Sequence, residues 1–196
     1  PENMDDIVHW QEAAREPASK TDLRHEIQPL SMQTDEQPRD EEQINQWLRD
    51  PSFIFGKPFY RVLLVVSPAI TVGVVIAAFF IDGITPVAVF AAALQWLFLG
   101  FHLKRVNAFH QYISRKKSML QNYGRILYFI RKEQYTSPLL RAFGSRAGEA
   151  DEKVRQLAAL VSTFDARLNS MTNLFVNALV LFDLQCVYRL EKWKAD

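Results

Sequence analysis

Two apolar segments lie back to back near the middle of this 196-residue chain. The first runs from Tyr60 to Ile81 and has no charged residue after Arg61, and the second runs from Ile84 to Leu103 without a charge. A helix of about 20 apolar residues spans the roughly 30 Å hydrocarbon core of a bilayer. Because Asp82-Gly83 is a turn signal and Thr85-Pro86 a helix start, the pattern predicts a transmembrane hairpin. The alternative is a buried hairpin in a soluble protein, which rarely carries uncharged runs of this length.

Flanking charge predicts how this hairpin lies in a membrane. Lys57 and Arg61 precede the first span, and Lys104, Arg105 and a basic triplet at 115–117 follow the second. Basic residues stay on the cytoplasmic side, so both ends of the hairpin are expected in the cytoplasm. Ionisable groups inside a span mark transporters and channels. None lies between Arg61 and Asp82 or between Asp82 and His102, so anchoring is a better interpretation than transport.

Charge also divides the rest of the chain. Residues 1–50 hold 13 of the 22 acidic residues and 5 of the 23 basic ones, so the remainder is net basic. We therefore expect an acidic helical part (1–57), the transmembrane hairpin (58–103) and a basic helical part (104–196). The chain begins without Met and ends in a charged helical pattern, which indicates a piece of a longer protein that continues beyond residue 196.

Helical periodicity extends over the rest of the chain, and no stretch alternates with period two. In the acidic part, the pattern predicts short helices over 5–15, 19–27 and 40–49. Pro17 ends the first helix, Pro29 follows the second, and a polar loop at 31–39 precedes the third. Trp10 and Trp47 are expected to pack inside. The fold class is therefore all-α: a helical domain interrupted by the two-helix transmembrane hairpin.

Beyond the hairpin, apolar residues recur at helical spacing from Val106 to Ile130, which predicts one long helix continuing the second span. Ser137-Pro138 predicts the next helix start and Gly144 a stop. A further helix is expected over 149–164, and Asp165 begins the last stretch. Its apolar face is marked by Leu168, Met171, Phe175, Leu179, Phe182 and Tyr188.

The segment 174–190 is apolar enough to suggest a third span, but it contains Asn177, Asp183, Gln185 and Arg189. Charges at a helix centre are costly in lipid, so a buried protein–protein helix is preferred. Asn169, Asn173 and Asn177 share a face, which indicates a polar stripe or, as a second interpretation, hydrogen bonds to a neighbouring helix. Cys186 is expected in the core.

No catalytic, cofactor or metal site is predicted. None of the seven glycines forms a phosphate-binding loop with Lys-Ser or Lys-Thr. The single cysteine excludes a thiolate zinc site and a disulfide framework. His102 and His110 have no carboxylate nearby in sequence. The chain is therefore not expected to be an enzyme by itself.

The segment from Lys104 to Arg146 carries ten basic residues against Glu133 alone. It could bind nucleic acid through phosphates, anionic lipid beside the membrane, or the acidic N-terminal part. Proximity to the hairpin favours lipid. The candidate contacts with phosphates or lipid headgroups are Lys104, Arg105, Arg115, Lys116, Lys117 and Arg125.

Several stretches resemble membrane-anchored relatives of the MutS mismatch-repair ATPases, a bacterial group. In the N-terminal part these are 7–18 and 22–27, although Trp10 and Pro17 stand where the pattern has Arg and Leu. Tyr135–Arg141 is similar to a recurring Ser-Pro-x-Leu element. The best match spans 160–194, in the sequences at Phe164–Asn169, Asn177–Asp183 and Arg189–Lys194.

This resemblance implies an all-helical core and lever region with a membrane hairpin, located in the bacterial inner membrane. In the family an ATPase domain follows, which binds ATP and magnesium, dimerises and couples to DNA. The P-loop, Walker B acid and signature segment of that ATPase domain are not among these residues. The resemblance therefore implies a non-catalytic segment, and dimerisation and DNA binding belong to the whole protein. Membrane insertion argues against a conventional mismatch-repair role. The alternatives are a membrane scaffold that binds a protein or anionic lipid and, less favoured, a transporter subunit.

Overall fold

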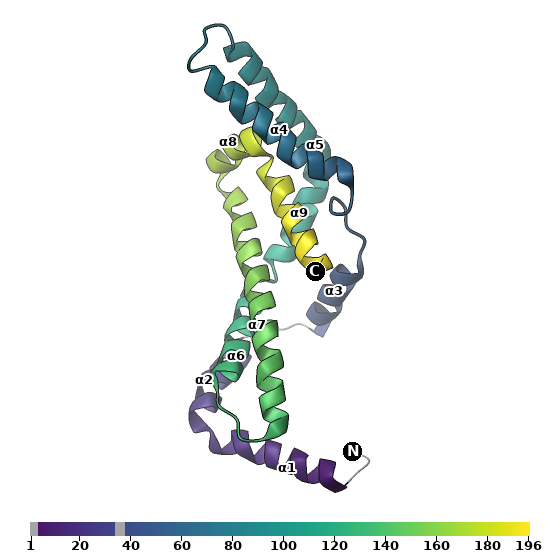
Figure 1. Ribbon diagram of the computed structural model, residues 1–196, viewed down its shortest axis with the longest axis vertical. Helices are drawn as coiled ribbons and strands as arrows, with labels where there is room; N and C mark the ends of the chain where they lie inside the picture. The colour runs from purple at the N-terminus through teal and green to yellow at the C-terminus, as the bar shows by residue number, and fades with distance from the viewer. Residues whose placement is uncertain (1–3, 34–37) are drawn as a thin grey trace. The chain divides into compact units, whose positions relative to one another are not determined.

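The computed structural model describes residues 4–33 and 38–196, and over these ranges the chain is helical with no strand (Figure 1). The all-α prediction is therefore confirmed. The helices are α1 (Met4–Ser19), α2 (Thr21–Gln33), α3 (Pro38–Arg49), α4 (Pro58–Ala77), α5 (Thr85–Ser114), α6 (Lys117–Lys132), α7 (Pro138–Asp165), the 3₁₀ turn η1 (Ala166–Leu168), α8 (Ser170–Val180) and α9 (Phe182–Ala195).

Two compact units make up the fold. The first combines the residues up to Asp40 with Lys116–Ala158, and the second combines Glu41–Arg115 with Ala159–Asp196. The hairpin therefore shares a unit with the segment before it and with the C-terminal helices. Within that second unit, α4 packs on α5, and α8 packs on both of them.

The predicted hairpin is present as α4 and α5, which run side by side and are long and apolar enough to cross a membrane (Figure 1). Many of its large apolar side chains face outward; Phe80 and Phe90 are 83% and 67% exposed. An apolar surface of this extent indicates lipid or a partner. Tyr60 Oη and His102 Nε2 hydrogen-bond across the two helices at 2.9 Å.

The helix of the second span continues beyond the uncharged run, as predicted, and α5 ends at Ser114. It does not extend to Ile130 as one helix, because the backbone turns at Arg115-Lys116 before α6 begins. Within α5, Val106 and Ile113 are buried, so the part after Leu103 has a packed face. One helix therefore links the apolar hairpin to the interior of the second unit.

The Thr85-Pro86 and Ser137-Pro138 signals mark helix starts as predicted, but three proline and glycine signals do not mark helix ends. Pro17 and Pro29 lie inside α1 and α2, and Gly144 lies inside α7, so the predicted stops there are wrong. A Cβ on Gly144 would contact the Tyr135 ring at 3.4 Å, and one on Gly148 would meet Arg131 Cδ at 3.1 Å. These two glycines allow the side chains of Tyr135 and Arg131 to lie close to the α7 backbone, and they do not end the helix. Of the predicted loop, 31–33 and 38–39 are helical, and 34–37 lie outside the described residues.

The packing predictions have mixed outcomes. Trp47 is buried against Phe109 and stacks on Trp193, with ring centroids 6.2 and 6.4 Å apart. Cys186 is buried, also as predicted. Trp10, in contrast, is 56% exposed, so its predicted interior packing is wrong.

A buried carboxylate fixes the backbone just before the hairpin. Glu191 of α9 is 3% exposed and accepts backbone N–H bonds from Phe53, Ile54 and Phe55 at 2.6–2.8 Å. Lys194, one turn further along α9, donates to the carbonyls of Trp47 and Asp50, the first at 3.1 Å. The end of α9 is therefore attached to the segment that leads into α4.

Replacing Glu191 by Gln should destabilise the second unit. An amide presents one acceptor oxygen and an NH₂ group to three donors, so one or two buried N–H groups lose their partner, at about 1–3 kcal/mol each. We expect a lower denaturation midpoint for Glu191→Gln in detergent, followed by circular dichroism. Glu149→Gln, at an exposed position on α7, is the matched control, and equal midpoints for the two variants would contradict the role assigned to Glu191.

The first unit uses a similar device. Glu16, near the end of α1, accepts backbone N–H bonds from Thr136 and Ser137 at 2.7 and 2.9 Å, directly before α7 begins. It thereby caps the N-terminus of another helix, where unpaired N–H groups favour an anion. Lys20 lies 2.6 Å from Glu133. The acidic part therefore contacts the basic part through these backbone amides and an ion pair with Glu133.

This cap should make stability depend on pH. The N–H groups of Ser137 and Thr136 hold the pKa of Glu16 below its ordinary value of about 4.5. A depressed folded-state pKa gives a stabilisation that is complete above about pH 4.5 and is lost as pH falls through the folded-state value. Wild type should exceed Glu16→Gln in melting temperature at pH 7, and the gap should close in acid. A gap that does not narrow at all as the pH falls below 4.5 would contradict this assignment.

Candidate functional site

The site with the most unusual geometry is the break between α8 and α9. Leu181 separates the two helices with φ of 51°, the one non-glycine residue with positive φ among the described residues. The helices meet at a 75° bend. A left-handed L-residue costs about 1–2 kcal/mol, and Leu181 is 1% exposed. The surrounding packing therefore holds this conformation in place.

Polar side chains satisfy the backbone groups that the break leaves without helical partners. Asn177 Oδ1 accepts the N–H of Asp183 at 2.9 Å and so caps α9. Gln185 Nε2 donates to Val180 O at 2.8 Å, and Gln95 Nε2 donates to Leu179 O at 3.2 Å. The preferred interpretation of the asparagines as a polar stripe is therefore wrong for Asn177, which is fully buried.

Gln95 also connects the break to the first helix of the hairpin. Its Nε2 atom donates to Thr71 Oγ1 and lies 3.3 Å from Ser67 O, both on α4. Gln95 and Thr71 are 3% and 2% exposed. One amide from the middle of the second uncharged run thus joins α4, α5 and the end of α8.

A buried ion pair lies next to the break. Asp183 Oδ2 is 2.9 Å from Arg167 Nη2, and the two side chains are 0% and 8% exposed. Arg167 also donates to Asn107 Oδ1 at 2.7 Å. Together with the Asn177 cap these contacts tie η1, α5 and α9 together. We call Gln95, Asn177, Asp183, Gln185 and Arg167 the polar junction.

A second polar contact joins α5 to the end of α7. His110 Nε2 lies 3.1 Å from Asp165 Oδ1, and Ser114 Oγ donates to the same oxygen. His110 therefore has a carboxylate partner, 55 residues away in sequence. A nucleophilic serine needs a base that takes its proton. Ser114 instead bonds the carboxylate that His110 also bonds, so this geometry is a structural clamp.

The predicted basic contacts divide between the two units. Lys104, Arg105 and Arg115 are exposed on or just after α5 in the second unit. Arg105 also lies over the Phe53 ring, 5.2 Å from its centroid. In the first unit Arg125 is exposed, Lys117 is partly exposed, and Lys116 is only 6% exposed. Lys116 therefore presents little surface to an external phosphate.

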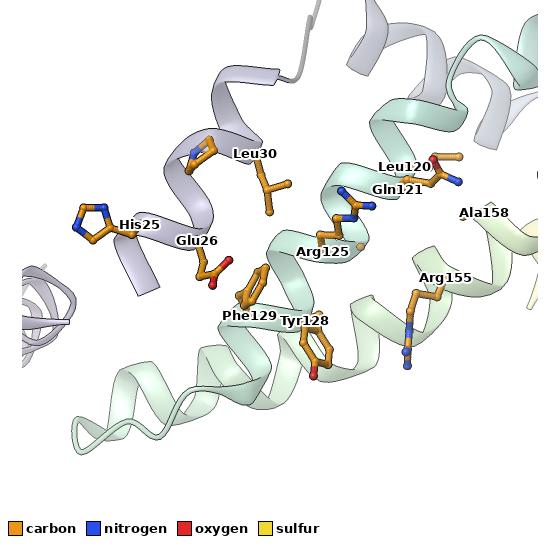
Figure 2. A pocket seen from close by; sticks show the side chains of 12 residues that line it. His25, Glu26, Leu30, Leu120, Gln121, Arg125, Tyr128, Phe129, Arg155 and Ala158 are labelled. Carbon is orange, nitrogen blue, oxygen red and sulfur yellow. The ribbon is translucent and has the colours of Figure 1, made fainter. Parts of the chain in front are cut away.

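Arg125 lines a pocket of about 900 Å³ within the first unit. Figure 2 shows Arg125 and Phe129 of α6 on the side that faces Leu30 and Glu26 of α2. Arg155 of α7 also lines it and is paired with the buried Asp151 at 3.2 Å. The guanidinium groups of the lining suit a phosphate, and its aromatic side chains suit a flat ring. The carboxylate of Glu26 would repel a bound anion.

Breaking the buried ion pair should have a larger effect than removing it whole. Arg167→Ala leaves Asp183 as an uncompensated buried charge, which costs about 3–5 kcal/mol. The double variant Arg167→Met with Asp183→Leu leaves no such charge and should recover most of that loss. Unfolding in a denaturing detergent titration measures both, with Arg189→Ala, at an exposed position on α9, as control. A double variant no more stable than Arg167→Ala would contradict the assignment.

Comparisons with protein-family models, with curated proteins and with solved structures found no match for this chain. The side chains of the polar junction and the His110–Asp165 contact hold a helix break, a hairpin and a long helix together by hydrogen bonds and buried charge.

Proposed function

We propose that this chain is the non-catalytic, membrane-anchored core and lever segment of a MutS-like ATPase. It would couple an ATP-binding domain elsewhere in the protein to DNA or another partner. The location would be the bacterial inner membrane, with both termini cytoplasmic. ATP, magnesium and homodimerisation would belong to the ATPase domain and not to these residues.

The observation that carries this proposal is the continuity of α5. This helix has 30 residues, a length of about 45 Å at 1.5 Å per residue. About two thirds of it lies in the uncharged run, and the remainder is held by Asn107, His110 and Ser114 to the chain at 165–167. A displacement of the end of α7 would therefore move the hairpin through one rigid element.

The polar junction supports the same function. α9 is fixed at its start by Asp183 and at its end by Glu191 and Lys194. Both attachments lead to the hairpin, one through α5 and one through the segment before α4. A lever needs such stiff connections because slack at either end would absorb the motion that it transmits.

The gene sequence beyond codon 196 provides the sharpest test. The proposal expects the reading frame to continue into a domain with a phosphate-binding loop, and a stop codon directly after Asp196 would rule it out. In the parent protein, purified in nanodiscs, Arg167→Ala should leave nucleotide binding intact and weaken the effect of ATP on partner binding. Arg189→Ala is the matched control, and an equal loss in both variants would contradict a lever role.

A membrane scaffold is the alternative that one observation favours. Lys104 and Arg105 are exposed directly after the second uncharged run, where each basic residue near an anionic surface contributes about 1 kcal/mol. This function predicts saturable binding to anionic vesicles that falls with salt, and no measurable DNA affinity. ATP-dependent DNA binding by the parent protein would favour the lever instead.

A further inference from the structure

The α8–α9 pair places both of its ends at the same end of the hairpin. Before α8, Asp165 contacts His110 and Ser114, which follow the uncharged run of α5. At the end of α9, Glu191 contacts Phe53–Phe55, which precede α4. A helix that crossed the membrane would have its ends at opposite ends of the hairpin. The two ends of the pair therefore lie at one end of the hairpin, unlike the ends of a third crossing.

The middle of this pair lies beside the apolar part of the hairpin. Trp96 Nε1 donates to Leu174 O at 3.1 Å, and Gln95 Nε2 donates to Leu179 O at 3.2 Å. Trp96 and Gln95 precede Leu103 by seven and eight residues, which is about 10–12 Å along a helix. Figure 1 shows α8 lying across the half of the hairpin nearer to α9. A bilayer that covers the uncharged run of α5 therefore reaches α8.

The outer face of this segment is apolar and uncovered. Leu168, Met171 and Phe175 are 71%, 71% and 63% exposed, and Leu174 is 47% exposed. α8 itself contains no charged residue. Leu168, Met171 and Phe175 belong to the apolar face that the sequence predicts for packing, yet no other part of the second unit covers them. α8 packs on α4 and α5, whose own large apolar side chains are also exposed.

Polar groups of the break are directed inward, as a lipid environment requires. Irregular backbone is tolerated at membrane depth only where it is buried in protein and hydrogen-bonded. Leu181 is buried, the carbonyls of Leu179 and Val180 are bonded to Gln95 and Gln185, and Asp183 is paired with Arg167. The break therefore satisfies the condition for a re-entrant membrane segment.

We infer that α8 and the start of α9 form a re-entrant segment in the cytoplasmic leaflet, with Met171, Leu174 and Phe175 against lipid acyl chains. The exposed Lys104 and Arg105 mark the headgroup level beside it. The inference deepens the anchoring part of the proposed function and rests on it, because it requires α4 and α5 to lie in the bilayer.

The test is the accessibility of nitroxide labels in vesicles of phosphatidylcholine and phosphatidylglycerol. Single cysteines are introduced into the full chain in a Cys186→Ala background at Met171 and Phe175. Phe90→Cys reports on the hairpin, and Lys153→Cys, at an exposed position on α7, reports on water. Collision with oxygen should exceed collision with a water-soluble nickel chelate several-fold at 171 and 175, as at 90, and the reverse should hold at 153.

Other outcomes contradict the inference in distinguishable ways. Nickel-favoured collision at 171 and 175, with position 90 oxygen-favoured, would place α8 in water and leave the anchoring intact. Low collision with both reagents would show that a second copy or another protein covers this face, which also overturns the inference. If position 90 is not oxygen-favoured, the anchoring itself fails.

Discussion

The second unit depends on how the peptide groups at the α8–α9 break are satisfied. A helix end beside an apolar hairpin cannot rely on water, so side chains must supply the missing partners. Gln95, Asn177 and Gln185 do this from three different positions in the unit. Because Gln95 also bonds α4, the same contacts that permit the break determine where the hairpin docks.

Buried charge fixes the position of α9 between these contacts. Asp183 lies in its first turn and Lys192 and Lys194 in its last, which matches the helix dipole at each end. Such pairs contribute little net stability compared with apolar packing, but removing one partner is costly. Arg167–Asp183 and the Glu191 cap therefore specify one arrangement of α9 more than they drive folding.

Local signals in the sequence predicted the hairpin, the helical content and the continuation of α5 past Leu103. Pro17, Pro29 and Gly144 misled because packing overrides their local tendencies, and Gly144 and Gly148 provide close approach. Glu16 caps backbone N–H groups 120 and 121 residues away, and Glu191 caps groups 136–138 residues away, so the sequence periodicity contains no sign of either contact. The polar junction is partly visible in the sequence. Asn177, Asp183 and Gln185 interrupt an otherwise apolar segment, and Gln95 lies in the middle of the second uncharged run.

The apolar stripe that includes Leu168, Met171 and Phe175 shows why such a pattern is ambiguous. Periodicity identifies a face that avoids water, but protein and lipid satisfy that requirement equally well. Here the face lies on a helix bonded to the hairpin through Trp96 and Gln95. The hairpin, the break and α9 therefore form one packed body within this unit. Motion applied to α9 would have to move the whole hairpin or break the polar junction.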